Sequence, residues 1–241
     1  MASPATGEVA AALRLDHVTK VFPGVRALDD VELTVRAGEV HGIVGENGAG
    51  KSTLMAVASG SLVPESGTVS ISGELLQAGS THAAQELGIA IVHQEPALLP
   101  DLTVAENMYL GVSGSSHSPP LARVRSWSRQ KLEAWSPQVG IDPDSRIEEL
   151  GAEQRFIVDI VRALAQEPAV LVLDEPTEHL AAAEGDQLLR DLLDANSGLV
   201  APDRTVVVVT HQLPVGHHAD TIVTVDAAGG CTVEHFRAAT E

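Results

Sequence analysis

The sequence predicts an α/β fold, with helices packed on a parallel β-sheet, and three observations support this prediction. First, residues 170–173, 205–209 and 221–225 are continuously apolar or β-branched, which is typical of strands buried on both faces of a parallel sheet. Second, the apolar residues 40–44 lead through a glycine-rich turn into a segment with helical spacing. Third, the helical periodicity over residues 104–164 predicts a helical insertion between these strands.

Composition and charge exclude several classes of protein. The 241 residues carry 15 basic and 33 acidic side chains, which gives a formal net charge of −18. A chain of this length forms one or two domains, since a domain has roughly 150 residues. Proteins that coat nucleic acid or bind anionic membranes need clustered Lys and Arg, so neither class is expected. The single cysteine excludes an internal disulfide, and no apolar stretch approaches the roughly 18 residues that span a bilayer.

The N-terminal region predicts a small antiparallel β-subdomain. Residues 1–12 are small and polar without a period, and we expect a loose leader there. Two apolar runs, residues 13–18 and 31–35, flank the turn-forming sequence Phe22-Pro23-Gly24, a pattern that favours antiparallel strands. Further strands are expected at residues 69–71 and 89–92.

The middle of the chain predicts an inserted helical subdomain. In its clearest helix one apolar stripe is formed by Phe156, Ile157, Ile160, Val161 and Leu164. We expect Arg155, Asp159 and Arg162 to be turned away from this stripe. Gly, Ser, His and Pro dominate residues 111–120, which predicts a surface loop. The expected organisation is one domain over residues 13–241, with a core of 13–94 and 165–241 and a helical subdomain of about 95–164.

A phosphate-binding loop is the strongest chemical signal. Gly45-x-x-x-x-Gly50-Lys51-Ser52 matches the Walker A pattern and lies between an apolar strand and an amphipathic helix, as the pattern requires. In such a loop backbone N–H groups surround a polyphosphate, the lysine contacts the terminal phosphates and the serine ligates Mg²⁺. The predicted ATP contacts are Gly45, Glu46, Asn47, Gly48, Ala49, Gly50, Lys51, Ser52 and Thr53. The alternative is a glycine-rich turn with a surface lysine.

Two acidic residues follow the strand predicted at residues 170–173. Ligands of open α/β sheets bind at the carboxyl ends of the strands, so Asp174 and Glu175 are expected near the phosphate-binding loop. We expect Asp174 to hold Mg²⁺ through water and Glu175 to polarise the water that attacks the γ-phosphate. The alternative is that both residues only cap a strand before Pro176.

These motifs, together with Asp174-Glu175-Pro176-Thr177 and a later strand that ends at Thr210-His211, resemble the nucleotide-binding domain of the ABC ATPase family. The resemblance extends over nearly the whole chain. The segments most similar to the ATPases of simple-sugar importers, of the ribose, xylose and galactose type, are residues 38–51, 92–95 and 102–107. The resemblance implies a P-loop NTPase with a RecA-like core, a small antiparallel β-subdomain and an inserted α-helical subdomain.

The resemblance also assigns three further residues to the site. Phe22 stands where the family has an aromatic ring that stacks on adenine, and packing in the turn or the core is the alternative. Gln94 matches the glutamine that contacts Mg²⁺ and the attacking water, against the alternative of a solvent-exposed loop residue. His211 matches the histidine that contacts the γ-phosphate and orients Glu175, and a structural histidine at the end of a strand is the alternative.

The signature loop of the family has an altered sequence in this chain. In place of Leu-Ser-Gly-Gly-Gln there is Leu150-Gly151-Ala152-Glu153-Gln154. In family dimers this loop closes over the ATP of the opposite subunit, so Leu150, Gly151 and Gln154 are expected nucleotide contacts. However, Gly151 lacks the hydroxyl group, and the carboxylate of Glu153 should repel phosphate. Residues 178–181 also lack the usual aspartate, and the chain carries one copy where sugar-importer ATPases usually carry two.

The sequence therefore predicts an ATP-binding and ATP-hydrolysing subunit that powers an ABC importer, with a simple sugar as the cargo that the resemblance implies. ATP and Mg²⁺ are the expected cofactors, and a second nucleotide-binding domain and membrane permease subunits are the expected partners. We expect a cytoplasmic chain, held at the inner face of the cell membrane through the permease. Two alternatives stay open: an ATP-binding regulatory or degenerate half of an asymmetric pair, and a soluble ABC ATPase without a transport role.

Overall fold

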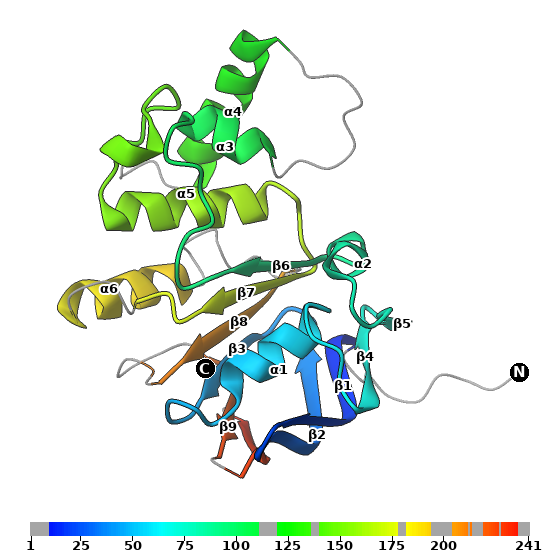
Figure 1. Ribbon diagram of the computed structural model, residues 1–241. Coiled ribbons are helices and arrows are strands. Elements are labelled where there is room, and N and C mark those ends of the chain that lie inside the picture. Colours follow the sequence, from blue (N-terminus) through cyan, green and yellow to red (C-terminus); the bar gives the residue numbers. More distant parts are fainter. Residues whose placement is uncertain are drawn as a thin grey trace, which may run out of the picture.

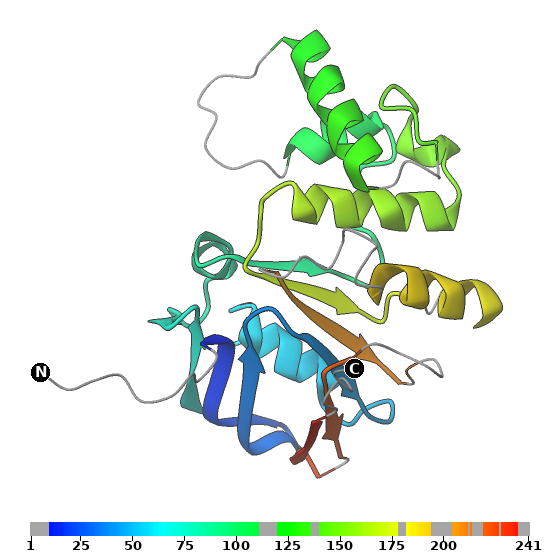
Figure 2. The ribbon, with the colours of Figure 1, turned by 180° about the vertical axis from the view of Figure 1, so that it is seen from behind.

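The computed structural model describes residues 10–110, 120–135, 140–177, 182–193, 204–211, 213, 219–226 and 228–235. Two β-sheets and the helices around them make up this part of the chain (Figures 1 and 2). The strands are β1 (Ala11–Phe22), β2 (Val25–Arg36), β3 (Val40–Val44), β4 (Ser66–Ile71), β5 (Glu74–Leu75), β6 (Ile89–Val92), β7 (Val170–Asp174), β8 (Thr205–Thr210), β9 (Thr221–Val225) and β10 (Cys231–His235). The helices are α1 (Lys51–Ala58), α2 (Thr81–Glu86), α3 (Val104–Leu110), α4 (Leu121–Trp135), α5 (Ala152–Leu164) and α6 (Ala182–Leu193), with a 3₁₀ turn, η1 (Ile147–Glu149), before α5.

The N-terminal strands form a four-stranded antiparallel sheet in the order β2-β1-β4-β5. One face, which includes Leu13 and Leu15 of β1, is buried in a core that it shares with α1. β1 begins at Ala11, so the predicted leader is too long by two residues, because the small side chain of Ala12 packs in this core and is 5% exposed. Residues 1–9 of the predicted leader and 111–119 of the predicted loop lie outside the described residues.

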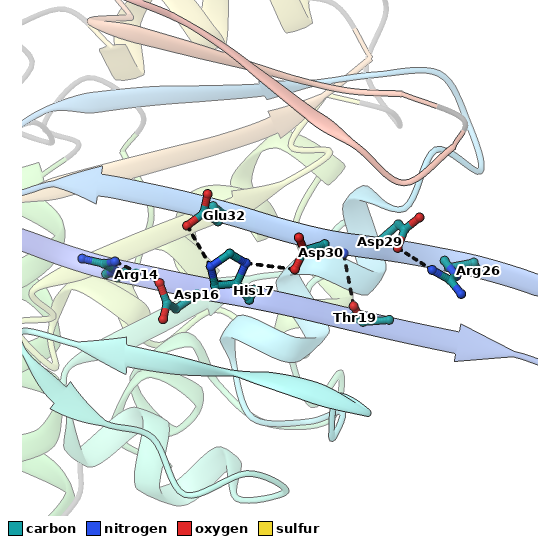
Figure 3. A network of polar contacts seen from close by, with 8 residues as sticks. All are labelled: Arg14, Asp16, His17, Thr19, Arg26, Asp29, Asp30 and Glu32. Atoms are coloured by element: carbon teal, nitrogen blue, oxygen red, sulfur yellow. Dashed lines mark hydrogen bonds and ion pairs between the residues drawn. The ribbon is translucent and has the colours of Figure 1, made fainter.

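β1 and β2 each have a β-bulge at an exposed residue, and the two bulges offset each other. β1 has one extra residue near His17 and β2 has one near Asp30, so the pairing returns to its original register. Both residues have positive φ, 52° and 54°, and Nδ1 of His17 lies 2.9 Å from Oδ1 of Asp30 (Figure 3). This hydrogen bond is the largest influence that raises the pKa of His17, and Glu32, 3.4 Å from Nε2, adds to it. On β4, Gly67 makes room for the bulge, since a Cβ there would lie 2.4 Å from the backbone oxygen of His17.

The central sheet has six strands in the order β10-β9-β3-β8-β7-β6. Strands β9, β3, β8, β7 and β6 are parallel, and β10 pairs antiparallel with β9 at the edge. Alternate side chains of β7 point to opposite faces: Val170 and Val172 join the core around α1, while Leu171 and Leu173 join the core around α5 and α6. The central sheet is therefore a middle layer, with α1 and the antiparallel sheet on one face and α5 and α6 on the other (Figure 1).

Helices α3, α4 and α5 pack against one another at the top of Figure 1. The predicted apolar stripe of α5 is buried, as expected, but the helix is buried on a second side as well. Asp159 was expected to be turned away from the packed stripe, and this prediction is wrong, because Asp159 is 2% exposed and pairs with Arg162. The reason is that α5 lies between the central sheet and the other two helices, so little of its surface faces solvent.

The observed sheets and helices confirm the predicted α/β class with a parallel sheet. Within the described part of the chain, no helix has both the length and the apolar character needed to cross a bilayer.

Candidate functional site

Four segments meet along the carboxyl edge of the central sheet. Residues 45–50, called the P-loop below, follow β3, and His211 follows β8. Asp174 is the last residue of β7, Glu175 comes directly after it, and Gln94 comes two residues after β6. Since β3, β8, β7 and β6 are adjacent and parallel, their carboxyl ends lie side by side. The topology therefore places the predicted catalytic residues along one edge.

Close backbone contacts explain two glycines of the P-loop. At Gly50, φ is 106° and a Cβ would lie 2.4 Å from the backbone oxygen of Ala27 on β2. At Gly45, a Cβ would lie 2.5 Å from the backbone oxygen of Val225 on β9. α1 begins directly after Gly50, and the N–H groups in the first turn of a helix have no acceptor within the helix. An anion at the start of α1 can therefore accept hydrogen bonds from these N–H groups.

Lys51 connects the P-loop to Glu175. Its side chain is 5% exposed, and Nζ donates to the backbone oxygens of Gly45 (2.8 Å) and Glu46 (3.3 Å). The same Nζ lies 3.4 Å from Oε1 of Glu175, whose Oε2 lies 3.5 Å from Nδ1 of His211. Lys51 is therefore buried and paired, unlike the surface lysine of the alternative interpretation. It forms a continuous chain of polar contacts with Glu175 and His211.

Glu175 has an unusual backbone for a residue that merely ends a strand. Its φ is 47°, in the left-handed region, and its N–H donates to the backbone oxygen of Val209 on β8 (2.8 Å). A left-handed conformation costs about 1 kcal/mol or more for a residue other than glycine, and such residues are concentrated at functional sites. The carboxylate is 14% exposed, so it is held in a largely enclosed position beside Lys51.

The predicted Mg²⁺ ligands lie on neighbouring elements of this edge. Ser52 is exposed in the first turn of α1, while Asp174 and Gln94 are half-buried at or just after the ends of β7 and β6. Hydroxyl, carboxylate and amide oxygens are the ligand types that Mg²⁺ prefers. The donor set therefore fits this ion.

Phe22 ends β1 with its ring accessible to solvent. The side chain is 39% exposed, and its neighbours Val21 and Val25 are also exposed. Nζ of Lys20 lies 5.6 Å from the ring centroid. Because the ring is outside the hydrophobic core, and β2 contacts the P-loop at Ala27 shortly after the turn, the geometry favours stacking with a ligand over packing in the core.

The signature loop, residues 150–154, precedes and begins α5 on the far face of the central sheet from α1. Leu150 is buried among α3, α4 and α5, and Glu153 is exposed. The N–H of Gly151 donates to Oε1 of Gln154 (3.1 Å). Figures 1 and 2 both place α5 beyond β6 and β7 from α1, so the structure does not bring Leu150, Gly151 and Gln154 to the P-loop of the same chain.

One pair of charged residues beside this site was missed by the sequence analysis. Asp159 and Arg162 of α5 form an ion pair, and Nη1 of Arg162 donates to the backbone oxygen of Ala97, in the segment that follows Gln94 (2.8 Å). The signal in the sequence is the spacing of an acid and a base three residues apart on a helix. The packing of the Gln94 segment on α5 could not be read from that spacing.

A P-loop at the carboxyl edge of a parallel sheet, with paired carboxylates on the next strand but one, defines the class of P-loop NTPases. The described chain has this arrangement and is a member of that class. More particularly, the chain belongs to the ABC transporter family, whose sequence model matches residues 28–178.

Curated relatives support a more specific placement within the family. The arabinose import ATP-binding protein AraG 2 of Burkholderia ambifaria is 45% identical over 205 residues, which are 84% of this chain and 38% of the relative. AraG of Azospirillum brasilense is 45% identical over 203 residues, which are 83% of this chain and 38% of that protein. This chain therefore spans 38% of the length of these relatives, and the predicted resemblance to ATPases of simple-sugar importers is confirmed.

Solved structures agree with the fold. A nucleotide-free ATP-binding cassette from an ABC transporter has a TM-score of 0.76 and 27% identity, with 94% of this chain and 92% of that chain covered. A dimeric cassette in a post-hydrolysis state, bound to ADP and Pi, has a TM-score of 0.73 and 26% identity, with 94% and 99% covered. The predicted P-loop NTPase fold, with its antiparallel and helical additions, is confirmed.

Proposed function

We propose that this chain binds ATP with Mg²⁺ and hydrolyses it in a dimer with a second nucleotide-binding domain. The observation that carries the proposal is the contact chain of Lys51, Glu175 and His211 at the carboxyl edge of the central sheet. In these contacts Lys51 is a cation that can bind phosphate, and Glu175 is a carboxylate that can accept a proton. His211 is a side chain that can orient this carboxylate.

ATP binding is assigned to the P-loop and to Phe22. The N–H groups at the start of α1 bind the phosphates, and Nζ of Lys51 exchanges the carbonyl oxygens of Gly45 and Glu46 for phosphate oxygens. Since Nζ is already buried beside the loop, this exchange needs only a small movement of the side chain. The exposed ring of Phe22 stacks on adenine, a contact worth about 1–3 kcal/mol.

Mg²⁺ is assigned to the oxygens of Ser52, Gln94 and, through water, Asp174. When bound, this ion neutralises negative charge on the phosphates. The chain's own part is to hold the three ligands on α1, after β6 and at the end of β7, so that they converge on the phosphate side of the sheet.

Hydrolysis is assigned to Glu175, with His211 in a positioning role. Oε1 of Glu175 lies 3.4 Å from Nζ of Lys51. A phosphate that attracts Lys51 frees this carboxylate, which then accepts a proton from the attacking water. We assign to His211, with Nδ1 3.5 Å from Oε2, the orientation of this carboxylate and contact with the γ-phosphate.

The proposed reaction needs a second domain, because the P-loop and the signature loop of one chain lie on different faces of its central sheet. Each of them forms half of a nucleotide site. Leu150, Gly151 and Gln154 lie across the central sheet from their own P-loop, so we assign them to the ATP bound by the partner domain. The similar cassette that is described as a dimer with ADP and Pi supports this arrangement.

The energy of hydrolysis is proposed to drive import of a simple sugar. Support comes from the relatives named for arabinose import, which are 45% identical to this chain. In this proposal the chain is cytoplasmic and reaches the inner face of the cell membrane through permease subunits, and nucleic acid is not a partner. The alternatives are a soluble ABC ATPase without a transport role and a regulatory domain with little turnover. Co-purification with a permease distinguishes the importer subunit from the soluble ATPase.

Comparison of wild type with Glu175→Gln tests the chemistry. We expect ATPase activity to fall about 10²–10⁴-fold, as for loss of a general base, while ATP binding is retained. Glu74→Gln, an exposed change of the same kind on β5, should leave activity unchanged. Equal activities of wild type and Glu175→Gln would contradict the proposal and favour the regulatory alternative.

A second candidate, a degenerate half of an asymmetric pair, is favoured by one observation. Gly151 has no hydroxyl group, and its N–H already donates to Gln154 of the same chain (3.1 Å). The partner's ATP would therefore meet a weak signature loop, while this chain's own P-loop is intact. Separate substitution of the Walker lysine in this chain and in its partner tests the asymmetry, and equal losses of turnover would contradict it.

A further inference from the structure

The end of β1 that carries Phe22 extends beyond the pairing of β1 with β4. This pairing stops at Thr19, which lies opposite Ser66, the first residue of β4. β1 nevertheless continues to Phe22, where the chain turns into β2. On its β4 side the extension therefore depends on partners other than a strand, because backbone N–H and C=O groups need hydrogen bonds.

Glu65, directly before β4, supplies such a partner with its side chain. The N–H of Glu65 donates to the backbone oxygen of Thr19 (2.9 Å), and Oε2 of Glu65 accepts the N–H of Val21 (2.9 Å). Backbone groups two residues apart on a strand face the same neighbour, so both bonds lie on the β4 side of β1. Glu65 thus supports β1 as far as the residue before Phe22.

Lys20 holds the Glu65 carboxylate and lies beside the ring of Phe22. Its Nζ donates to Oε1 of Glu65 (2.9 Å) and to the backbone oxygen of Val63 (2.7 Å). The Lys20 side chain is 12% exposed, and Nζ lies 5.6 Å from the centroid of the Phe22 ring, within the range of a cation–π interaction. The hydrogen bond from Lys20 is the largest influence that lowers the pKa of Glu65, and the bond from the Val21 N–H adds to it.

On its other side the Phe22 hairpin contacts the P-loop. The residue pairing around Lys20 and Val21 leaves Ala27 as an additional residue on β2. The backbone oxygen of Ala27 lies against Gly50, where a Cβ would be only 2.4 Å away. The hairpin is therefore held on its β2 side by the P-loop contact and on its β4 side by Lys20 and Glu65.

We propose that Lys20 and Glu65 position the Phe22 ring against the base of the bound nucleotide, an inference that rests on the proposed function. Both are positioning residues, because they act on the ring and on the backbone of Val21 and not on the nucleotide. The ammonium group of Lys20 lies over one face of the ring, and the base stacks on the other face. The pair consequently contributes to affinity for the base, whereas the phosphates are bound by the P-loop.

Calorimetry of the full chain with two ligands separates the base from the phosphates. The probes are a non-hydrolysable ATP analogue and inorganic tripolyphosphate, each with Mg²⁺. Glu65→Ala removes the acceptor of the Val21 N–H, and Lys20→Met removes the charge and keeps an unbranched side chain. Each variant should weaken binding of the ATP analogue by at least about threefold, a part of the stacking contribution, and leave tripolyphosphate binding unchanged.

A matched control and a double variant complete the experiment. Asp16→Asn removes a different ion pair of β1, in which Oδ1 of Asp16 lies 2.9 Å from Nη2 of Arg14, and it should leave both affinities unchanged. In the Phe22→Ala background, Glu65→Ala should cause no further loss of affinity for the ATP analogue, since two residues that act through one ring are not additive.

Three results would overturn the inference. They are wild-type affinity for the ATP analogue in Glu65→Ala or Lys20→Met, equal losses for the two ligands, and a full further loss when Glu65→Ala is added to Phe22→Ala. Wild-type affinity for the analogue in Phe22→Ala would instead refute the stacking assigned under the proposed function. A wild type that binds neither ligand would refute the proposed nucleotide binding, so the failures are distinguishable.

Discussion

His41 on β3, the strand that leads into the P-loop, makes the folded chain sensitive to moderate acid. Its side chain is 0% exposed, and Nε2 accepts the backbone N–H of Arg36 (3.2 Å). The same Nε2 lies 3.2 Å from Oε2 of Glu39, a carboxylate that favours the protonated ring, but burial outweighs it. Burial is the largest of the influences that lower its pKa from 6.5 to about 4, and the charges of Arg36 and His235 add to it. His41 is therefore neutral in the folded chain at pH 5, where an unfolded chain has a protonated histidine.

The sign and size of the effect follow from this difference in proton binding. Above pH 6.5 His41 is neutral in both states, and below it the unfolded state binds the extra proton, so stability is lost as pH falls from 6.5 toward 4. Between pH 7 and pH 5 this single residue should remove about 2 kcal/mol from the free energy of unfolding, since each pH unit below 6.5 contributes about 1.4 kcal/mol.

Urea unfolding at pH 7 and pH 5 measures this loss in wild type and in His41→Gln. Glutamine does not titrate, and its amide oxygen can accept the N–H of Arg36, so the loss between the two pH values should be smaller in the variant by about 2 kcal/mol. His82→Gln is the control, because His82 is 75% exposed and lies on α2. Equal losses in wild type and His41→Gln would refute the reasoning.

Three further predictions concern the site. Phe22→Ala should weaken ATP binding by about 10-fold, measured by calorimetry, with little change in Tm because the ring is outside the core; equal affinities would exclude the stacking role. Gly50→Ala should abolish ATP binding and lower Tm, since its Cβ would lie 2.4 Å from the oxygen of Ala27 at a φ of 106°, whereas exposed Gly73→Ala should leave ATP binding intact. Gly151→Ser with Glu153→Gly should raise turnover about 10-fold or more in an asymmetric dimer by restoring a hydroxyl and removing a carboxylate, and unchanged turnover would show that the signature loop is not limiting.

The fold class and the positions of the site residues along the chain could be predicted from the sequence, because both depend on local patterns. The apolar residues of β8 reflect burial on both faces, and Gly45 and Gly50 of the P-loop reflect positions where a Cβ has no room. The order of the strands depends on pairings between distant segments. The sequence predicts that Glu175 lies near the phosphate-binding loop, and the structure adds the contacts of its carboxylate with Lys51 (3.4 Å) and His211 (3.5 Å).

The error at Asp159 shows where local patterns stop being informative. An acid and a base beside an apolar stripe resemble the solvent-exposed face of a helix, and the same spacing also suits a charged pair that closes over a neighbouring segment. The choice between these depends on whether another chain segment covers that face. Here the segment after Gln94 covers that face of α5, and the sequence of α5 does not indicate this contact.

The arrangement of the two half-sites explains why changes in them can have separate effects. The P-loop, Glu175 and His211 are positioned by strands β3, β7 and β8 of the central sheet, which are buried on both faces. The signature loop is positioned by α5, from which Arg162 donates to the backbone oxygen of Ala97 in the segment after Gln94. In the proposed dimer, a substitution at Gly151 or Glu153 therefore alters what the partner's nucleotide encounters, while the residues of the chain's own phosphate site are unchanged. Under the proposed function, a complete P-loop with an altered signature loop predicts an asymmetric dimer, in which one composite site turns over faster than the other.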